Sequence, residues 1–206
     1  MFFKGMPLGG MQTNCYILGD EESGKCAVFD PAAEADKILS FVEGNGFKVQ
    51  YIILTHVHAD HIMGLDKLKK LTDAKIVVHK GDAEMLNDSS YTLSDLFLST
   101  APQSTVDIVA NDGDILELGS LNLNVIHTPG HTLGGMCVFC GDTLVAGDTL
   151  FASSIGRTDF PGGDYDTLIE SIKDKLMVLD DDINVYPGHG MPTTIGYERK
   201  NNPYLR

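Results

Sequence analysis

The chain has 206 residues, 43% of them hydrophobic, and no linker, low-complexity tract or charge block divides it, so we expect one domain over residues 1–206. A formal net charge of −14 argues against nucleic acid and anionic membranes as partners, because like charges repel and no counterions would be released. The first residues do not resemble a signal peptide and no apolar run is long enough to cross a membrane, which favours a cytoplasmic protein.

The chain predicts a succession of short strands and helices. From hydrophobic periodicity and turn residues, strands are expected near residues 2–6, 11–18, 25–30, 51–54, 75–79, 115–117, 121–127, 136–139, 143–146 and 183–186. Helices are expected over 32–42, 61–71, 165–179 and, in a less regular stretch at 81–104, over about 83–87. Such a succession implies an α/β fold in which helices cover sheets, and the stretch 81–104 could cover a site.

Three imidazoles and a carboxylate follow the strand at 51–54 within six residues. Alternate residues of an extended segment point the same way, so His56 and His58 can converge on one ion. Asp60 and His61 come where the chain must bend toward a helix, which displaces them toward a second ion. Crowded histidines repel one another when protonated and contribute little packing, so a metal site is the best interpretation of this run.

Three further candidate ligands each follow a predicted strand. His131 and His189 come directly after Pro-Gly pairs, which break a strand and begin a loop, and Asp148 ends the apolar run 143–147. No single turn can surround two cations, so we expect these distant residues to complete the site. The same local pattern, a predicted strand followed by a candidate ligand, occurs three times, which is hard to attribute to chance.

These segments resemble the metallo-β-lactamase superfamily, whose pattern T-H-x-H-x-D-H, T-P-G-H-T, G-D-T-L and P-G-H-G is matched in order over almost the whole chain. The resemblance implies a four-layer αββα sandwich with the metal site at one edge of the two sheets. It implies two divalent metal ions, with zinc as the first expectation and iron or manganese as alternatives. The implied ligands are His56, His58 and His131 for the first metal, Asp60, His61 and His189 for the second, and Asp148 for both.

Two such cations can lower the pKa of water from 15.7 to about 7, so we expect a metal-bridged hydroxide to attack a carbonyl, with Asp60 as the catalytic residue that orients it. No second general acid occurs among the motif residues, which favours a leaving group that departs without a proton. A thiol, with a pKa near 8.5, leaves readily as the anion. A small-molecule thioester is therefore expected ahead of an activated ester or lactone, and an amide last.

Within the superfamily the chain is similar to small glyoxalase II-like hydrolases, which cleave acylglutathione thioesters. Residues 155–164 resemble a loop of that group, and residues 198–206 resemble its N-P-F-x-R tail. By this resemblance Arg157 and Arg206 would bind glutathione carboxylates, although Arg157 could instead form an ion pair with Asp159 that shapes the loop.

Other functions of the same fold stay open. A persulfide dioxygenase keeps the histidine pattern but uses a single iron at the first site, and an ester or lactone hydrolase would need the same residues. Two tyrosines of the glyoxalase II site are replaced here by Asp159 and Met191. The additional C-terminal helical domain of full-length glyoxalase II has no counterpart in residues 1–206. A β-lactamase is less expected, because the second site here is richer in histidine than in most of those enzymes.

The remaining histidines and the cysteines are expected to be structural. His79 and His127 have no counterpart among the family's ligands. All four cysteines are predicted to be small core residues. Cys137 and Cys140 match C-x-x-C, but residues three apart on a strand face opposite sides of the sheet, so they are not expected to form a redox or zinc pair.

Overall fold

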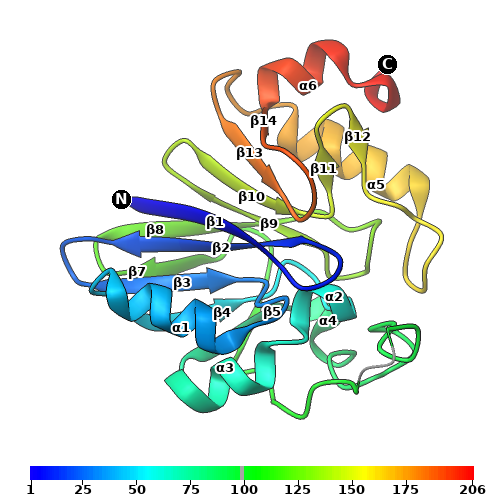
Figure 1. The fold of residues 1–206 in the computed structure, drawn as a ribbon. Helices are drawn as coiled ribbons and strands as arrows, with labels where there is room; N and C mark the ends of the chain where they lie inside the picture. The colour runs from blue at the N-terminus through cyan, green and yellow to red at the C-terminus, as the bar shows by residue number, and fades with distance from the viewer. Residues whose placement is uncertain (98–99) are drawn as a thin grey trace.

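Two six-stranded sheets face each other in the computed structural model, which describes residues 1–97 and 100–206 (Figure 1). The first sheet contains, in spatial order, β1 (Phe2–Leu8), β2 (Thr13–Asp20), β3 (Lys25–Phe29), β4 (Lys48–Ile53), β5 (Lys75–His79) and β6 (Ile108–Ala110). The second contains β14 (Thr193–Thr194), β13 (Asn184–Pro187), β10 (Thr143–Gly147), β9 (Met136–Cys140), β8 (Leu121–His127) and β7 (Ile115–Leu118). A separate hairpin pairs β11 (Leu150–Phe151) with β12 (Ser154–Ile155).

Helices cover the outer face of each sheet. The α-helices are α1 (Ala35–Gly44), α2 (Ala59–Ile62), α3 (Leu65–Thr72), α4 (Lys80–Ala83), α5 (Tyr165–Ser171) and α6 (Ile195–Asn201). A π-helix (Ile172–Leu176) continues α5, and a 3₁₀ turn (Pro203–Leu205) follows α6. In Figure 1, α1 and α3 lie against the first sheet, whereas α5 and α6 lie against the second.

Three separate hydrophobic cores define four layers. The first core joins α1 and α3 to the outer face of the first sheet, through residues such as Ile38, Leu68 and Ile52. The second joins the two sheets, with Phe29 facing partners such as Val138. The third joins the second sheet to α5, the π-helix and α6. The predicted αββα sandwich is therefore confirmed.

Strand direction gathers the functional loops at one edge. Strands β3, β4 and β5 are parallel neighbours, and so are β10 and β13. Strand β8 runs in the same direction as β10, because both are antiparallel to β9. Parallel strands have their carboxyl ends at the same edge of a sheet. The loops after β8, β10 and β13 therefore begin at one edge of the second sheet. The loop after β4 lies beside them, because the backbone of Met136 donates to the Thr55 carbonyl at 2.9 Å.

Several predicted helix boundaries are wrong. The expected helix 61–71 is two helices, α2 and α3, because the chain turns at Gly64, whose backbone donates a hydrogen bond to the Pro31 carbonyl. A Cβ at Gly64 would lie 2.6 Å from that oxygen, so this close approach requires glycine. The helix expected at 83–87 is α4, which ends at Ala83. The helix expected over 165–179 ends at Leu176: α5 stops at Ser171, and the π-helix continues it to Leu176.

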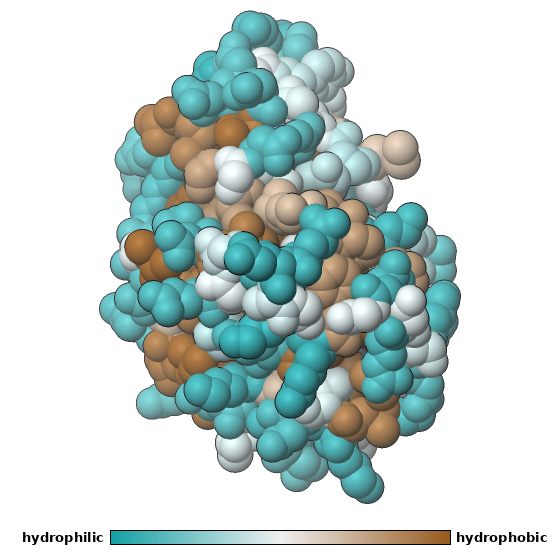
Figure 2. Space-filling model, turned by 90° about the vertical axis from the view of Figure 1, so that its left-hand side faces the viewer, coloured by the Kyte–Doolittle hydropathy of each residue, from teal (hydrophilic) through white to brown (hydrophobic). Residues whose placement is uncertain are grey.

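The cysteines lie where the strand pattern predicted. All four are buried and free. Cys137 packs in the core beneath α5, whereas Cys140 packs between the sheets, so the two face opposite sides of β9. Among the helices of the described residues, none has the length and apolarity needed to cross a bilayer. The face in Figure 2 is largely hydrophilic, with its hydrophobic residues in separate groups.

Candidate metal centre

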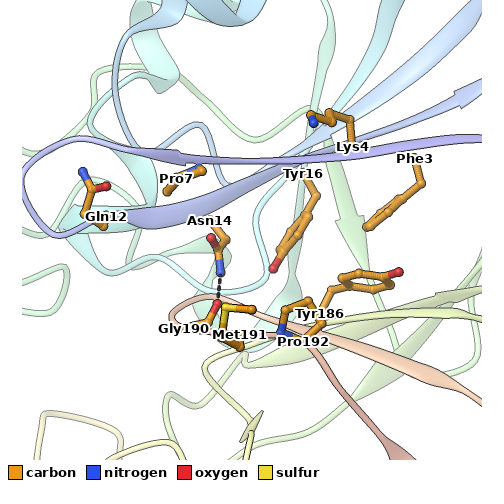
Figure 3. A pocket seen from close by; sticks show the side chains of 11 residues that line it. Phe3, Lys4, Pro7, Gln12, Asn14, Tyr16, Tyr186, Gly190, Met191 and Pro192 are labelled. Atoms are coloured by element: carbon orange, nitrogen blue, oxygen red, sulfur yellow. Dashed lines mark hydrogen bonds between the residues drawn. The ribbon is translucent and has the colours of Figure 1, made fainter.

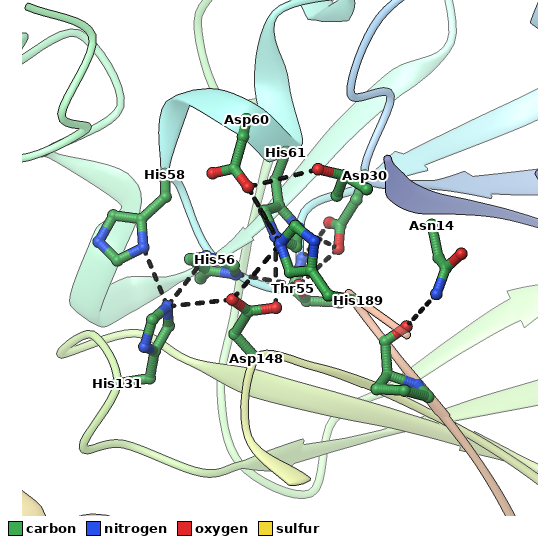
Figure 4. Close-up of polar contacts among 12 residues, drawn as sticks. Asn14, Asp30, Thr55, His56, His58, Asp60, His61, His131, Asp148 and His189 are labelled. Atoms are coloured by element: carbon green, nitrogen blue, oxygen red, sulfur yellow. Dashed lines mark hydrogen bonds and ion pairs between the residues drawn. The ribbon is translucent and has the colours of Figure 1, made fainter. Parts of the chain in front are cut away.

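The ligands predicted for the first metal lie together in the structure. His56 and His58 follow β4, and His131 follows β8. The Nε2 atom of His131 lies 2.9 Å from Nδ1 of His58 and 3.3 Å from Nε2 of His56 (Figure 4). All three residues are buried, with at most 3% of their surface exposed. Three imidazole nitrogens that face one another in a buried space form a set suited to a divalent metal ion.

The ligands predicted for the second metal form an adjacent group. Asp60 and His61 lie on the single turn of α2, and His189 follows β13. Oδ2 of Asp60 lies 3.0 Å from Nε2 of His189 and 3.8 Å from Nε2 of His61. These ligand atoms all lie within 4.8 Å of one another. The two groups are contiguous, because the ring centre of His61 lies 4.1 Å from that of His56 and 5.3 Å from that of His189.

Asp148 lies between the two groups. Its Oδ1 is 3.3 Å from Nε2 of His61, and its Oδ2 is 3.7 Å from Nε2 of His131. Oδ2 is also 3.8 Å from Nε2 of His189, so the carboxylate reaches ligands of both groups (Figure 4). The backbone leaves room for this arrangement at Gly188, where a Cβ would lie 2.2 Å from Oδ1 of Asp148 and 2.6 Å from Cε1 of His61.

Hydrogen bonds on the outer side of the rings fix their tautomers. His131 directs Nδ1 to the Arg157 carbonyl at 2.7 Å, so this nitrogen carries the proton and Nε2 keeps a lone pair. The Asp30 carboxylate accepts from Nδ1 of His61 at 2.9 Å, which leaves Nε2 of His61 free in the same way. Ligand lone pairs therefore point into the cluster.

Thr55 connects the same carboxylate to His56. The Thr55 hydroxyl donates to Oδ2 of Asp30 at 2.6 Å, and its oxygen lies 3.2 Å from Nδ1 of His56. Since the hydroxyl proton is used, Nδ1 of His56 must be the donor to Thr55. Asp30 is 1% exposed and Thr55 also 1%. Both were missed in the sequence, although Asp30 ends a strand just as Asp148 does.

The electrostatics of the cluster suit a cation. Burial, together with the charge that neighbouring imidazoles would carry, holds the pKa of His56 well below its usual range and that of His58 at about 3, so both rings are neutral at pH 7. Burial also opposes a charge on His61, but Asp148 and Asp60 outweigh it and raise its pKa well above the usual range. A bound cation would take the place of that proton.

Buried polar atoms without a hydrogen bond point to the same conclusion. Nε2 of His61 and Oδ1 of Asp148 are both buried, and no hydrogen bond satisfies either atom. Unsatisfied buried polar atoms are costly, and here they face one another inside the cluster. The residues present therefore fit two divalent cations.

A cavity of about 440 Å³ opens beside the cluster. Its walls include Asp148, His189, Arg157 and Met191. Arg157 forms a two-point ion pair with Asp159, at 2.8 and 2.7 Å, and its guanidinium lies 3.8 Å from the centre of the Phe160 ring. The predicted ion pair is thus present, and Arg157 lines the cavity as well. Arg206, at the exposed chain end, is not among the described residues that line it.

A second hollow of about 550 Å³ lies on the other side of the 189–191 loop (Figure 3). Its lining is largely aromatic and apolar, and includes Phe3, Tyr186 and Pro192. The Asn14 amide donates to the carbonyls of Pro187 and Gly190, at 3.0 and 3.1 Å, and so holds the loop that carries His189 against β2.

His79 and His127 lie outside the cluster, in agreement with a structural role. Their rings stack with centres 3.8 Å apart. Nδ1 of His79 accepts from the backbone of Gly81 at the start of α4, and Nε2 of His127 lies 3.0 Å from the Leu133 carbonyl.

The layered sheets and the histidine and aspartate cluster at their common edge define an α/β protein built to hold divalent metal ions. The chain belongs to the metallo-beta-lactamase superfamily, which it matches over residues 8–189. The family resemblance drawn from the sequence motifs is therefore confirmed.

Two relatives with functional names cover nearly the whole chain. The hydroxyacylglutathione hydrolase GloC of Haemophilus influenzae is 37% identical over 204 residues, which are 97% of this chain and 96% of that protein. The probable metallo-hydrolase YqgX of Bacillus subtilis is 34% identical, over 100% of this chain and 98% of that protein. These similarities place the chain among the metallo-hydrolases of the superfamily.

Solved structures show the same fold. The BLEG-1 B3 metallo-beta-lactamase superposes with a TM-score of 0.94 at 33% identity and covers 99% of both chains. TTHA1623 in a di-iron-bound form superposes with a TM-score of 0.87 at 30% identity and covers 98% of this chain and 100% of that one. ETHE1 from Myxococcus xanthus superposes with a TM-score of 0.83 at 30% identity and covers 98% of this chain and 84% of that one.

Proposed function

We propose that this protein hydrolyses small-molecule thioesters, in the manner of a hydroxyacylglutathione hydrolase, with two divalent metal ions. The observation that carries the proposal is the position of Asp148, whose carboxylate reaches ligands of both groups: Oδ1 faces His61, and Oδ2 faces His131 and His189. A relative named as a hydroxyacylglutathione hydrolase, 37% identical, supports the substrate class. Zinc is our first choice of metal. Iron is the second, because a structural neighbour is described in a di-iron-bound form.

The side chains of the cluster divide the work. His56, His58 and His131 would hold one cation, Asp60, His61 and His189 the other, and Asp148 both. When bound, the cations supply a water with a pKa near 7 and positive charge beside the developing oxyanion. Oδ2 of Asp60 accepts a hydrogen bond from the Thr13 hydroxyl at 3.3 Å. Its other oxygen can then accept a proton from the attacking water.

The cavity walls favour a leaving group that departs as an anion. Apart from His189, which would hold a cation, the described residues that line the cavity include no histidine, lysine, tyrosine or cysteine that could donate a proton to the leaving group. A thiolate meets this requirement, because a thiol pKa near 8.5 makes the anion stable enough to leave. This supports a thioester ahead of an ester, lactone or amide.

The test is the metal content of the protein purified without added metal, followed by a hydrolysis assay with a panel of thioesters, esters, a lactone and a β-lactam. We expect about two divalent ions per chain and the highest kcat/KM on a thioester. A single tightly held iron with oxygen uptake would instead favour the persulfide dioxygenase. Preferred cleavage of the β-lactam would assign the activity named for BLEG-1.

Arg157→Ala should raise the KM for S-lactoylglutathione about tenfold with little change in kcat. An exposed charge-assisted contact contributes on the order of 1–3 kcal/mol and would be present equally in the ground and transition states. The measurement is steady-state kinetics beside a thioester without carboxylates, for which KM should not change. Arg206→Ala, assayed in parallel, tests the second predicted contact.

Asp159→Asn is the matched control. It weakens the ion pair that now engages Nε and Nη2 of Arg157, so it should lower KM for the carboxylate-bearing substrate. If Arg157→Ala affects both thioesters alike, Arg157 only shapes the loop and glutathione is not the carrier.

A further inference from the structure

Another buried carboxylate packs against the loop that carries His131. Asp82, on α4, is 0% exposed and accepts three hydrogen bonds. The Tyr91 hydroxyl and the Gly134 backbone donate to its Oδ1 at 2.9 and 2.7 Å, and the Thr132 hydroxyl donates to its Oδ2 at 2.8 Å. The Tyr91 oxygen in turn accepts from the backbone of Leu133 at 3.0 Å. Asp82 and Tyr91 thus hold the three residues that follow His131.

The backbones are packed so closely here that glycine is required. A Cβ on Gly134 would lie 2.3 Å from the backbone nitrogen of Asp82, and one on Gly81 would lie 2.5 Å from the Leu133 carbonyl. The same segment also holds the other ligand loop, because the backbone of Ala59 donates to the Thr92 carbonyl at 2.7 Å. Residues 82–92 therefore fix the loops of His58 and His131 relative to each other.

The charge of Asp82 has no basic side chain beside it. No lysine or arginine of the described residues is buried, and none forms an ion pair with Asp82. Burial raises the pKa of this carboxyl, whereas the hydrogen bonds and a positive charge at His131 oppose the rise. A buried carboxylate without a cationic partner is strongly unfavourable. Positive charge at the neighbouring ligand group would relieve this.

We propose that Asp82 is a positioning residue of the first metal site, which fixes the His131 loop and whose negative charge is balanced by the ion at His56, His58 and His131. This inference rests on the proposed two-metal function. It explains why a carboxylate, rather than an amide or a hydroxyl, occupies a fully buried position that touches no ligand directly.

The substitution Asp82→Asn removes the negative charge of the side chain and keeps its size and shape. The amide oxygen can accept from Tyr91 and Gly134, and the amide nitrogen can donate to the Thr132 hydroxyl after that hydroxyl turns. We expect zinc affinity at the first site to fall about 10- to 100-fold, measured by competition with a chromophoric chelator. The metal-free variant should unfold at the same temperature as the metal-free wild type or higher, because the uncompensated buried charge is gone.

Two further variants complete the test. Tyr91→Phe keeps the charge but removes two hydrogen bonds, so it should lower both zinc affinity and the unfolding temperature of the metal-free protein. Asp20→Asn is the matched control, since Asp20 is a buried carboxylate bonded to Ser23 and Ser120 at the far end of β2, and it should not change zinc affinity.

The outcomes distinguish this inference from the proposed function. Wild-type zinc affinity in Asp82→Asn, or an equal loss in Asp20→Asn, would overturn the role of Asp82. Failure of the wild type to bind two zinc ions would overturn the proposed function instead. A metal-free Asp82→Asn that unfolds at a lower temperature while it keeps wild-type affinity would reduce Asp82 to a structural residue.

Discussion

Asp148→Ala should lower kcat/KM for thioester hydrolysis on the order of 10³-fold and reduce the metal content below two ions per chain. The carboxylate reaches ligands of both groups, with Oδ1 3.3 Å from His61 and Oδ2 3.7 Å from His131 and 3.8 Å from His189. Its loss leaves two cations without the negative charge between them, and metal stabilisation of the transition state is worth several kcal/mol. Elemental analysis and steady-state kinetics on the same preparation measure both effects.

The matched control for this prediction is Asp142→Ala. Asp142 precedes β10, whereas Asp148 follows it, and Asp142 is exposed. We expect this variant to keep two metal ions and nearly full activity. Two tightly bound ions and wild-type kinetics in Asp148→Ala would show that the carboxylate is not shared between two metals.

The ligand positions could be predicted because each depends on local sequence. A strand that ends in a histidine pair, a Pro-Gly break before a histidine, and an apolar run that ends in an aspartate are all visible within a few residues. The αββα layering, implied by the family resemblance, then brings the carboxyl ends of β4, β8, β10 and β13 to one edge. Their spatial grouping follows from the fold rather than from any single motif.

The residues that support the ligands could not be found in this way. Asp30 reaches His61 across 31 residues, and Asp82 reaches Thr132 across 50. A lone aspartate in a chain with 29 acidic residues carries no local signal of such a partner. Of the two, Asp30 was easier to predict, because it directly follows β3 just as Asp148 directly follows β10. The role of Asp82 can be inferred only from the structure, in which Gly134 packs against it.

The helix errors have the same physical origin. Leu65, Leu68 and Leu71 recur at helical spacing, which favours a helix over 61–71. Leu65 and Leu68 are buried on one face of α3, whereas Leu71 is 45% exposed. The break at Gly64 depends on the carbonyl of Pro31, which hydrophobic periodicity cannot reveal. Tertiary contacts thus decided where α2 ends, and that end sets the positions of Asp60 and His61.

Asp30→Asn should lower zinc affinity at the second site about 10- to 100-fold, with a comparable fall in kcat. Asp30 accepts from the Thr55 backbone at Oδ1, and from both the Thr55 hydroxyl and His61 at Oδ2. An amide has one acceptor oxygen, so in one orientation its NH₂ group faces the Thr55 backbone donor. In the other orientation the NH₂ group faces Nδ1 of His61, which can then no longer donate. The proton of His61 must move to Nε2, and Nε2 loses the lone pair that faces Asp148.

The substitution should not strain the backbone, because Asp30 has a φ of +48° and asparagine adopts the left-handed region readily. Asp73→Asn is the matched control: Asp73 also has a positive φ, +53°, but is exposed at the end of α3. It should keep wild-type zinc affinity. Zinc titration of both variants, monitored by isothermal calorimetry, should show a weakened second binding step only in Asp30→Asn. An unchanged second step would mean that the tautomer of His61 does not depend on the Asp30 carboxylate.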